Sequence, residues 1–266
     1  MKRVVFVTGA GSGIGRAIAE RLASDGYMVY GGARKTRVDW PEGVRYMQMD
    51  VTDESSVKRV MHSIQNEHGY LNAVLNCAGL GMLGAIEDSS SDELRELFET
   101  NVVGVHNVCK NALPLLRQSG SGHIINITSM AAQMGLPFRG VYCASKFAVE
   151  GYTEALSIEV AADDIRVVLV EPGDVHTSIN TNRKIVSAVS DRNQALQVSI
   201  HRQVNNEVVK GLHPSVIARV VAGILINPSP ALRYRIAPFK AKWAYYMMRL
   251  LPDRWFEALV RRHYRL

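Results

Sequence analysis

The sequence reads Thr8-Gly9-Ala10-Gly11-Ser12-Gly13-Ile14-Gly15 directly after the short apolar run Val4-Val5-Phe6-Val7. The apolar run predicts a buried strand, and the apolar spacing of residues 16–23, closed by Gly26, predicts a helix. The glycines therefore lead from the first strand into the first helix. Backbone N–H groups at a helix N-terminus attract anions, and glycines allow a phosphate to approach closely. We interpret this turn as a phosphate-binding site, with a purely steric glycine turn as the alternative. Its candidate residues are Gly9, Gly11, Ser12, Gly13, Ile14 and Gly15.

Short apolar strands and amphipathic helices alternate from this turn to about residue 175. The further strands are expected at 28–33, 73–76, 123–127 and 165–170. The further helices are expected at 55–68, at 92–117 with Ser91 or Asp92 as N-cap, and at 142–161. This alternation is typical of βαβ units, in which helices cover both faces of a parallel sheet. The sequence predicts an α/β fold: a single doubly wound, Rossmann-type parallel sheet with a helical C-terminal extension.

Composition excludes several protein classes. The chain has 266 residues, 47% of them hydrophobic and 21% charged, which suits one domain, although the length also allows two. Ordinary glycine, proline and aromatic contents exclude collagen-like and disordered chains. The three scattered cysteines Cys77, Cys109 and Cys143 predict buried thiols in a reducing compartment. Because no apolar run reaches the ~18 residues of a membrane span and the first run is too short for a signal peptide, we expect a cytoplasmic protein.

The net charge of +6 is concentrated at one end of the chain. Residues 231–266 contain nine basic and two acidic side chains, whereas residues 1–230 contain 22 basic and 23 acidic ones. The high isoelectric point is therefore a property of the terminal segment, and the chain shows no recognisable nucleic-acid-binding module. We expect no nucleic-acid partner. We also expect no metal ion, because no His, Cys or Asp cluster has the spacing of metal ligands.

The end of the second strand indicates which dinucleotide would bind. Sites that prefer NAD usually place an acidic residue there for the ribose 2′-hydroxyl, whereas a basic residue accommodates a 2′-phosphate. Here Ala33 stands in place of the acid and is followed by Arg34 and Lys35, while Asp39 comes only after the basic cluster. These residues predict NADP(H), with a solvated basic loop as the alternative.

Three side chains form a candidate proton-transfer site. Tyr142 and Lys146 are four residues apart on an expected helix, so they share a face. A phenol titrates near ~10, and a neighbouring ammonium group would lower the pKa of Tyr142 towards a useful range. Ser129 ends the preceding strand, at the sheet edge where α/β proteins bind ligands, and its hydroxyl can hold a carbonyl or hydroxyl oxygen beside Tyr142.

Together these motifs resemble the short-chain dehydrogenase/reductase family over roughly residues 4–177. The resemblance rests on residues 8–15, Asp50-Val51-Thr52-Asp53, Asn76-Cys77-Ala78-Gly79, Asn101, Ser129, Tyr142-Cys143-Ala144-Ser145-Lys146 and Pro172-Gly173-Asp174-Val175-His176-Thr177. Cys77 replaces the second asparagine of the commonest form of its motif. All four members of the family's catalytic set are present: Asn101, Ser129, Tyr142 and Lys146.

The resemblance implies a role for each of these positions. Tyr142 would be the general acid/base, Ser129 would orient the carbonyl, and Lys146 would tune Tyr142 and bind the nicotinamide ribose. Asn101 would hold a water that relays protons to Lys146. Asp50 and Val51 would contact the adenine. Asn76, Ala78 and Gly79 would line the adjoining ribose. Pro172, Gly173, Val175 and Thr177 would lie at the nicotinamide, with Val175 and Thr177 holding its carboxamide. The implied chemistry is hydride transfer at the nicotinamide C4.

The remaining sequence is expected to select the substrate. Residues 178–213 are polar and weakly patterned, where the family keeps a mobile substrate loop; an ordinary pair of surface helices is the alternative. Residues 231–266 hold eight of the nineteen aromatic residues among many cations. This layout is similar to the hydroxysteroid and retinol dehydrogenase branches, whose extended C-termini enclose lipophilic substrates. Three interpretations compete: a lid over an apolar site, a docking surface for anionic lipid, and a plain packing helix.

We therefore expect one catalytic domain over residues 1–230, including the substrate loop, with residues 231–266 as its basic aromatic extension. The expected function is NADP(H)-dependent interconversion of a ketone or aldehyde with its alcohol on a lipophilic, steroid- or retinoid-like substrate. One alternative is a reductase of small polar carbonyls, sugars or 3-oxoacyl thioesters. Another, of a different class, is an NADPH-sensing regulatory protein. By resemblance alone we expect a homodimer through residues 92–117 and 142–161, cytoplasmic with possible peripheral membrane contact through the extension.

Overall fold

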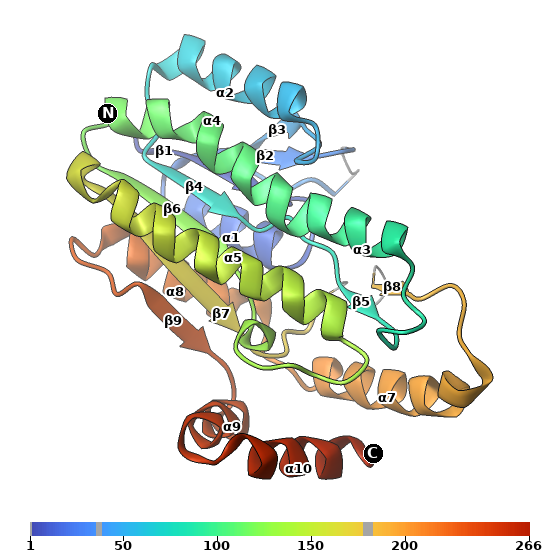
Figure 1. Cartoon of the computed structure of the whole chain (residues 1–266). Coiled ribbons are helices and arrows are strands. Elements are labelled where there is room, and N and C mark those ends of the chain that lie inside the picture. Colours follow the sequence, from blue (N-terminus) through green and yellow to red (C-terminus); the bar gives the residue numbers. More distant parts are fainter. Residues whose placement is uncertain (1, 36–38, 178–182) are drawn as a thin grey trace.

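The computed structural model describes residues 2–35, 39–177 and 183–266, and it centres on a seven-stranded parallel sheet (Figure 1). The strand order is β3-β2-β1-β4-β6-β7-β9, and every neighbouring pair is parallel. The strands are β1 Val4–Thr8, β2 Met28–Ala33, β3 Val44–Gln48, β4 Ala73–Asn76, β6 Gly122–Ile127, β7 Ile165–Pro172 and β9 Arg233–Ile236. The chain winds outward in one direction from β1 to β3 and in the other from β4 to β9. The expected doubly wound sheet is confirmed.

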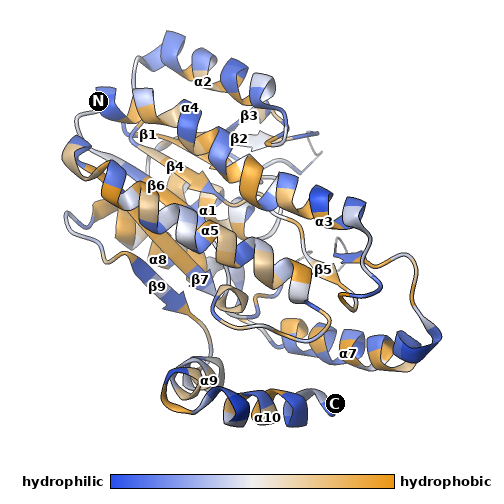
Figure 2. Cartoon of the chain, viewed as in Figure 1, coloured by the Kyte–Doolittle hydropathy of each residue, from blue (hydrophilic) through white to orange (hydrophobic). Residues whose placement is uncertain are grey.

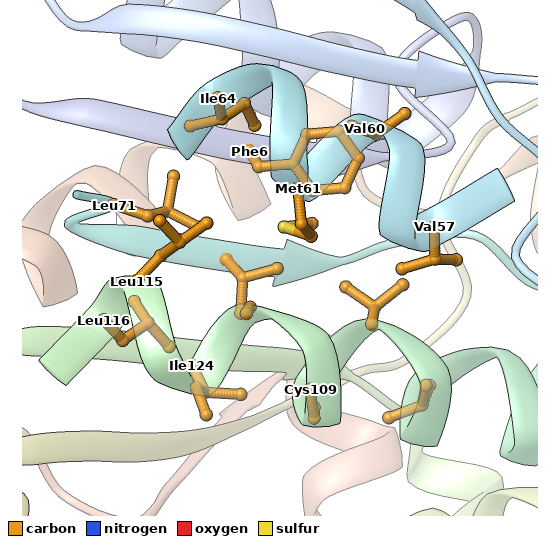
Figure 3. Packing of buried hydrophobic residues seen from close by; sticks show 14 of the residues in the cluster. Phe6, Val57, Val60, Met61, Ile64, Leu71, Cys109, Leu115, Leu116 and Ile124 are labelled. Atoms are coloured by element: carbon orange, nitrogen blue, oxygen red, sulfur yellow. The ribbon is translucent and has the colours of Figure 1, made fainter. Parts of the chain in front are cut away.

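Helices cover both faces of this sheet. On one face α2 (Glu54–His68), α4 (Gly104–Gln118) and α5 (Gly140–Glu159) pack over a buried apolar cluster (Figure 3). On the other face α1 (Gly13–Ser24) and α8 (Pro214–Ile226) pack over a second cluster. The central strands are strongly apolar because both of their faces are covered (Figure 2). The reversal of winding between β1 and β4 opens a crevice at the carboxyl ends of the strands, where such folds bind ligands.

The expected single helix over residues 92–117 is in fact three segments. The helix α3 (Ser91–Phe98) is followed by a π-helical turn over Glu99–Val103 and then by α4. The N-cap is Ser90 rather than Ser91 or Asp92: its hydroxyl accepts from Glu93 N, and the Glu93 carboxylate accepts from Ser90 N. This reciprocal capping box satisfies two orphan donors, which explains why the helix begins there.

The segment 178–213 is more regular than a polar loop. Residues 178–182 lie outside the described residues. Beyond them, β8 (Lys184–Ile185) pairs with β5 (Met82–Leu83), and α7 runs over Asp191–Val209. Ile200, Val204 and Val208 recur every four residues and are buried, so α7 packs one face on the body of the protein. The described part of this segment is therefore a packed helix with a short strand pair.

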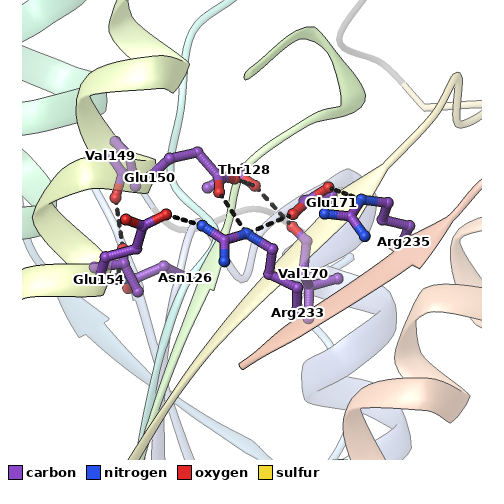
Figure 4. A network of polar contacts seen from close by, with 10 residues as sticks. Asn126, Thr128, Val149, Glu150, Glu154, Val170, Glu171, Arg233 and Arg235 are labelled. Atoms are coloured by element: carbon purple, nitrogen blue, oxygen red, sulfur yellow. Dashed lines mark hydrogen bonds and ion pairs between the residues drawn. The ribbon is translucent and has the colours of Figure 1, made fainter. Parts of the chain in front are cut away.

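The terminal segment begins inside the sheet. The edge strand β9 was not expected from the sequence, and it pairs with β7. Arg233 of β9 forms ion pairs with Glu150, Glu154 and Glu171, and Arg235 forms one with Glu171 (Figure 4). The helices α9 (Phe239–Leu250) and α10 (Asp253–Tyr264) follow beyond this edge (Figure 1). Among the described residues, no helix is both long and apolar enough to cross a membrane.

Candidate active site

The glycine turn between β1 and α1 has a backbone that only glycine accommodates without strain. Gly9 has φ +65° and Gly13 has φ +57°, both in the left-handed region. A Cβ on Gly15 would lie 2.5 Å from the Gly9 carbonyl oxygen, and one on Gly9 would lie 3.0 Å from the Ala78 backbone. The turn is thus closed against the end of β4 and leaves the N-terminus of α1 open to a ligand. This is the cradle that a pyrophosphate requires.

Thr8 joins the glycine turn to the segment after β4. Its Oγ1 accepts hydrogen bonds from the backbone N–H groups of Cys77 and Ala78, each at 2.9 Å. Asn76 points elsewhere: its Nδ2 donates to Asn126 Oδ1 at 2.8 Å and to Cys109 Sγ at 3.3 Å, inside the protein. Its side chain is therefore engaged in holding β4 to β6, and a ribose contact at this position would use its backbone.

The residues expected at the adenine end lie at the ends of β2 and β3. Arg34 and Lys35 are exposed immediately after β2. Asp39, the late acidic candidate, forms an ion pair with Arg16 of α1. Asp50 Oδ1 accepts from the Thr52 N–H at 3.0 Å and the Thr52 hydroxyl at 2.9 Å, which fixes the turn after β3. Val51 is buried and packs close to Gly104 of α4.

Ser129, Tyr142 and Lys146 come together in one cavity at the carboxyl edge of the sheet. Ser129 follows β6, and Tyr142 and Lys146 lie on the first turns of α5. The Lys146 ammonium group lies 6.0 Å from the centroid of the Tyr142 ring and donates to the Ile127 carbonyl oxygen at 3.2 Å. Nine expected residues share this cavity: Ile14, Gly79, Ser129, Tyr142, Lys146, Pro172, Gly173, Val175 and Thr177.

The electrostatics differ from the expected pattern. Burial raises the pKa of Tyr142, and the opposing effects of a hydrogen bond with Ser129 and of the Arg139 charge are smaller. Burial also lowers the pKa of Lys146 to about 8. With a pKa of about 8, Lys146 still carries most of its charge at neutral pH, but burial dominates the pKa of Tyr142. The pKa of Tyr142 is therefore raised by burial, whereas we expected Lys146 to lower it.

Asn101 lies in the π-helical turn and is buried. Its Oδ1 accepts from Leu80 N at 2.8 Å, and its Nδ2 donates to Leu80 O and to Ser145 Oγ, each at 3.0 Å. These bonds link the segment after β4 to α5, which carries Tyr142 and Lys146. The extra residue of a π-turn often marks a functional site, and here it directs the amide inward between those two elements.

The segment after β7 closes the cavity from the other side. Val175 is buried and forms a bridge with Leu212, and a Cβ on Gly173 would lie 2.8 Å from Cβ of Ala237. A Cβ on Gly13 would lie 3.4 Å from Thr177 Cβ, so the glycine turn and the 172–177 segment face each other. Ile14 of the turn and Thr177 line the same cavity as Tyr142. A dinucleotide stretching from the glycine turn towards Tyr142 fits this arrangement.

Three charged residues that our sequence reasoning missed also line the cavity: Arg139, Asp174 and Arg183. Arg139 precedes α5, and its Nη2 donates to the Tyr264 hydroxyl of α10. Its Nε is buried without a hydrogen-bond partner among the described residues. The charges of Arg139 and Arg183 both favour the ionised form of Asp174, although burial raises its pKa. Asp174 lies inside a quoted motif, but Arg139 and Arg183 had no motif or periodicity that could have indicated them.

Comparison with known proteins supports the same assignment for most of the chain. A sequence model of the family described as short chain dehydrogenase matches residues 3–186. The 3-ketodihydrosphingosine reductase of Bacteroides thetaiotaomicron is 38% identical over 89% of this chain and 88% of its own. The 17-beta-hydroxysteroid dehydrogenase type 1 of Homo sapiens is 33% identical over 88% of this chain and 77% of its own. A crystal structure of a short-chain dehydrogenase from Streptomyces avermitilis is similar with a TM-score of 0.81 and 31% identity, covering 94% of this chain and 92% of that one.

Proposed function

The chain belongs to the short-chain dehydrogenase/reductase family, and from this premise we propose that it is an NADP(H)-dependent reductase of lipophilic ketones or aldehydes. Members of the family are oxidoreductases that use nicotinamide cofactors and act on small molecules. The observation that carries the proposal is a single cavity. Its lining includes Ser129, Tyr142 and Lys146 together with Ile14 of the glycine turn.

The choice of NADP(H) rests on charge at the end of β2. Arg34 and Lys35 are exposed where a 2′-phosphate would lie, and no acidic residue occupies the position of Ala33. Asp39 is already engaged by the guanidinium group of Arg16, which makes it a poor acceptor for a ribose 2′-hydroxyl. A phosphate dianion between cations gains charge-assisted hydrogen bonds that a hydroxyl does not.

Each side chain of the site has a different role in carbonyl reduction. A bound nicotinamide supplies the hydride to the carbonyl carbon. Tyr142 donates its phenolic proton to the carbonyl oxygen, and Ser129 donates a hydrogen bond that orients the same oxygen. Lys146 holds positive charge beside the phenolate that forms. Asn101 positions this group by holding Leu80 and Ser145.

The cavity indicates an amphiphilic substrate rather than a purely apolar one. Leu80, Met82 and Val208 supply apolar lining, whereas Arg139, Asp174 and Arg183 place charges near Tyr142. These charges in the cavity lining suit a substrate with polar groups beside its carbonyl. We propose a long-chain ketone with a polar head, of which the substrate in the name of the Bacteroides thetaiotaomicron relative is one example. The same charges also favour the second candidate, a smaller polar carbonyl or a 3-oxoacyl thioester.

Cofactor choice is tested by titrating NADPH and NADH into the wild type, Arg34→Ala and a control, Arg59→Ala, which removes an exposed arginine on α2. We expect the wild type to prefer NADPH and Arg34→Ala to lose about tenfold in NADPH affinity, with NADH and the control unchanged. Equal or tighter NADH binding by the wild type would disprove the NADP(H) assignment and would make alcohol oxidation the direction to test.

Substrate class is tested by NADPH consumption with 3-ketodihydrosphingosine, a steroid ketone, retinal, a sugar aldehyde and a 3-oxoacyl thioester. We expect the long-chain amino ketone to give the highest kcat/KM and Tyr142→Phe to abolish turnover while NADPH still binds. Faster turnover of the thioester or the sugar would favour the second candidate. A biological activity that survives in Tyr142→Phe would contradict the enzymatic proposal and favour an NADPH-sensing regulator.

We also propose a cytoplasmic homodimer. Cys77, Cys109 and Cys143 are all free thiols, which suits a reducing compartment. The outer face of α5 exposes a stripe of small and apolar residues that suits a contact between two copies.

A further inference from the structure

The helix α9 exposes an apolar stripe. Phe239, Trp243, Tyr246 and Leu250 follow one another at intervals of four, three and four residues, so they lie on one face of the helix. All four side chains are exposed, Trp243 by 54% and Leu250 by 77%. Tyr245 of α9 is buried, and the guanidinium carbon of Arg235 lies 4.1 Å from the centroid of its ring, on the side towards the sheet. An aromatic stripe that faces away from the protein costs solubility unless something covers it.

The helix α10 repeats the arrangement. Trp255 and Leu259 are four residues apart and exposed, Trp255 by 68%. Tyr264 lies nine residues after Trp255, which is two and a half turns, so it lies on the opposite side. There it is buried beside Ile200 and Val204 of α7, with Val260 against the same cluster. One side of α10 therefore packs on the body of the protein, and the other presents a tryptophan and a leucine to solvent.

Cations surround both exposed stripes. Arg249 on α9 and Arg254, Arg261, Arg262 and Arg265 on or after α10 are all exposed, against the two acidic residues Asp253 and Glu257. Glu257 is shared by ion pairs with Arg254 and Arg261. Arg254 and Arg261 are seven residues apart and so lie on one flank of α10. Arg265 follows the end of α10 and lines a groove with Arg202 and Lys210 instead. The surface is strongly positive around its aromatic residues.

We propose that this surface docks the protein onto a membrane that carries anionic lipid. The docking face consists of the exposed residues of α9 (Phe239, Trp243, Tyr246, Leu250) and of α10 (Trp255, Leu259), with Arg249, Arg254, Arg261 and Arg262. Indole and phenol rings settle at the headgroup level of a bilayer, and arginines beside them gain energy from anionic headgroups. A second copy of the chain is a poorer occupant, because a two-fold contact would bring four arginines of each copy together.

The docking face adjoins the candidate active site. Tyr264, on the inner side of α10, accepts a hydrogen bond from Arg139, and Arg139 lines the cavity that holds Tyr142. The same helix thus contacts the cavity wall on one side and is open to a membrane on the other. Docking itself does not depend on the proposed function, because it requires neither cofactor nor turnover.

The test uses the full chain with vesicles of phosphatidylcholine, alone or mixed with phosphatidylserine. Two of the three tryptophans, Trp243 and Trp255, belong to the docking face, whereas Trp40 is half-buried and donates to Val44 O. We expect co-sedimentation and a blue shift of tryptophan emission with the anionic vesicles only. Raising the salt concentration should weaken both, because surface charges are screened.

Two variant pairs separate the contributions. Trp243→Ser with Trp255→Ser, and Arg261→Gln with Arg262→Gln, should each weaken vesicle affinity by about tenfold or more. The matched controls are Ile226→Ser, an exposed apolar residue of α8, and Arg59→Gln with Arg219→Gln, exposed arginines elsewhere; both should bind like the wild type. Equal binding to both kinds of vesicle, no binding, or unchanged binding by both variant pairs would overturn the proposal. So would conversion of a larger assembly to a smaller one by the tryptophan variant in solution.

A kinetic readout keeps this proposal separate from the proposed function. On a ketone dissolved in detergent-free buffer, Trp243→Ser with Trp255→Ser should keep wild-type kcat and KM. On the same class of ketone presented in anionic vesicles, KM should rise several-fold with kcat unchanged. If no ketone is turned over at all, the vesicle measurements still decide the docking proposal.

Discussion

At the scale of single residues, Tyr142 and Lys146 make a prediction about pH. Reduction requires the phenol of Tyr142 to carry its proton and Lys146 to carry its charge. The pKa of Tyr142 is raised, while that of Lys146 is lowered to about 8, so Lys146 is the first to titrate as the pH rises. We expect kcat/KM for ketone reduction to be level near neutral pH and to fall above about pH 8. Initial rates of ketone reduction measured from pH 6 to 10 test this pH dependence.

The control for this pH profile is Lys146→Met. It should be slower at every pH and should lack the fall near pH 8, because the titrating group is gone. A reduction rate that increases steadily from pH 7 to 9 in the wild type would contradict the assignment of these two groups.

Gly9 allows a second prediction at this scale. Gly9 and Gly26 both have positive φ, so alanine strains the backbone at each and should cost about 1 to 2 kcal/mol of unfolding free energy. They differ in surroundings: a Cβ on Gly9 would meet the Ala78 backbone at 3.0 Å, whereas nothing lies within 4 Å of one on Gly26. Gly9→Ala should therefore also lose at least about tenfold in NADPH affinity. Gly26→Ala should bind NADPH normally, and equal loss in both would argue against the turn as the binding site.

At the scale of elements, Glu171, which pairs with the edge strand β9, makes the stability of the fold depend on pH. Glu171 is buried, its pKa is raised to about 7 by burial, and it forms ion pairs with Arg233 and Arg235 (Figure 4). A raised carboxyl pKa means that the folded state holds the proton more tightly. Its contribution to stability is full below the unfolded pKa of 4.5 and is lost as the pH rises through about 7. The loss amounts to at most about 3 kcal/mol. Glu150 is shifted in the same direction.

His123 changes the stability of the fold with pH in the opposite direction. Burial lowers its pKa to about 4, so its contribution is full above 6.5 and is lost as the pH falls towards 4. In the wild type, the contributions of Glu171 and His123 to the slope of unfolding free energy against pH therefore oppose each other between pH 5 and 7. Urea unfolding at pH 5, 6, 7 and 8 should show that Glu171→Gln gains stability relative to the wild type as the pH rises. His123→Gln should gain relative stability as the pH falls, and parallel curves for wild type and Glu171→Gln would refute the assignment.

The elements also show what the sequence could and could not reveal. The strands at 28–33 and 73–76 are found with the expected bounds, because buried parallel strands are continuous apolar runs between turn signals. The edge strand β9 carries Arg233 and Arg235 and looked like a loop, since their partners Glu150 and Glu171 lie more than 60 residues away in sequence. The π-helical turn that holds Asn101 could not be predicted from the sequence either, because one inserted residue barely alters the apolar spacing of a helix.

The candidate site was easier to predict from sequence than its substrate specificity. Residues such as Ser129, Tyr142 and Lys146 fall in ordered motifs, and the fold brings them into one cavity. Arg139 and Arg183 enter that cavity from segments whose position depends on how α5, α7 and α10 pack. Tertiary packing of this kind leaves no periodic signal in a single sequence, which is why the charged end of the cavity was missed.

At the scale of the whole molecule, α5 predicts how two copies associate. Its inner face carries Tyr142 and Lys146, while its outer face exposes Ala144, Phe147, Gly151, Ala155 and Ile158. These small and apolar residues form a smooth stripe along nearly the full helix, on the face of the sheet that α4 also covers (Figure 1). Two such stripes related by a two-fold axis would pack closely and exclude water. We expect a dimer through α5, as the resemblance to the family also implies.

Phe147→Glu with Ile158→Glu tests this association, because it would place four carboxylates in the contact. We expect sedimentation velocity to show a dimer for the wild type and a monomer for this variant. Val198→Glu, which charges an exposed position on α7, is the control and should remain dimeric. Because α5 also carries the catalytic pair, the monomer should lose thermal stability and part of its reductase activity. A monomeric wild type, or a variant that still dimerises, would place any association on another face.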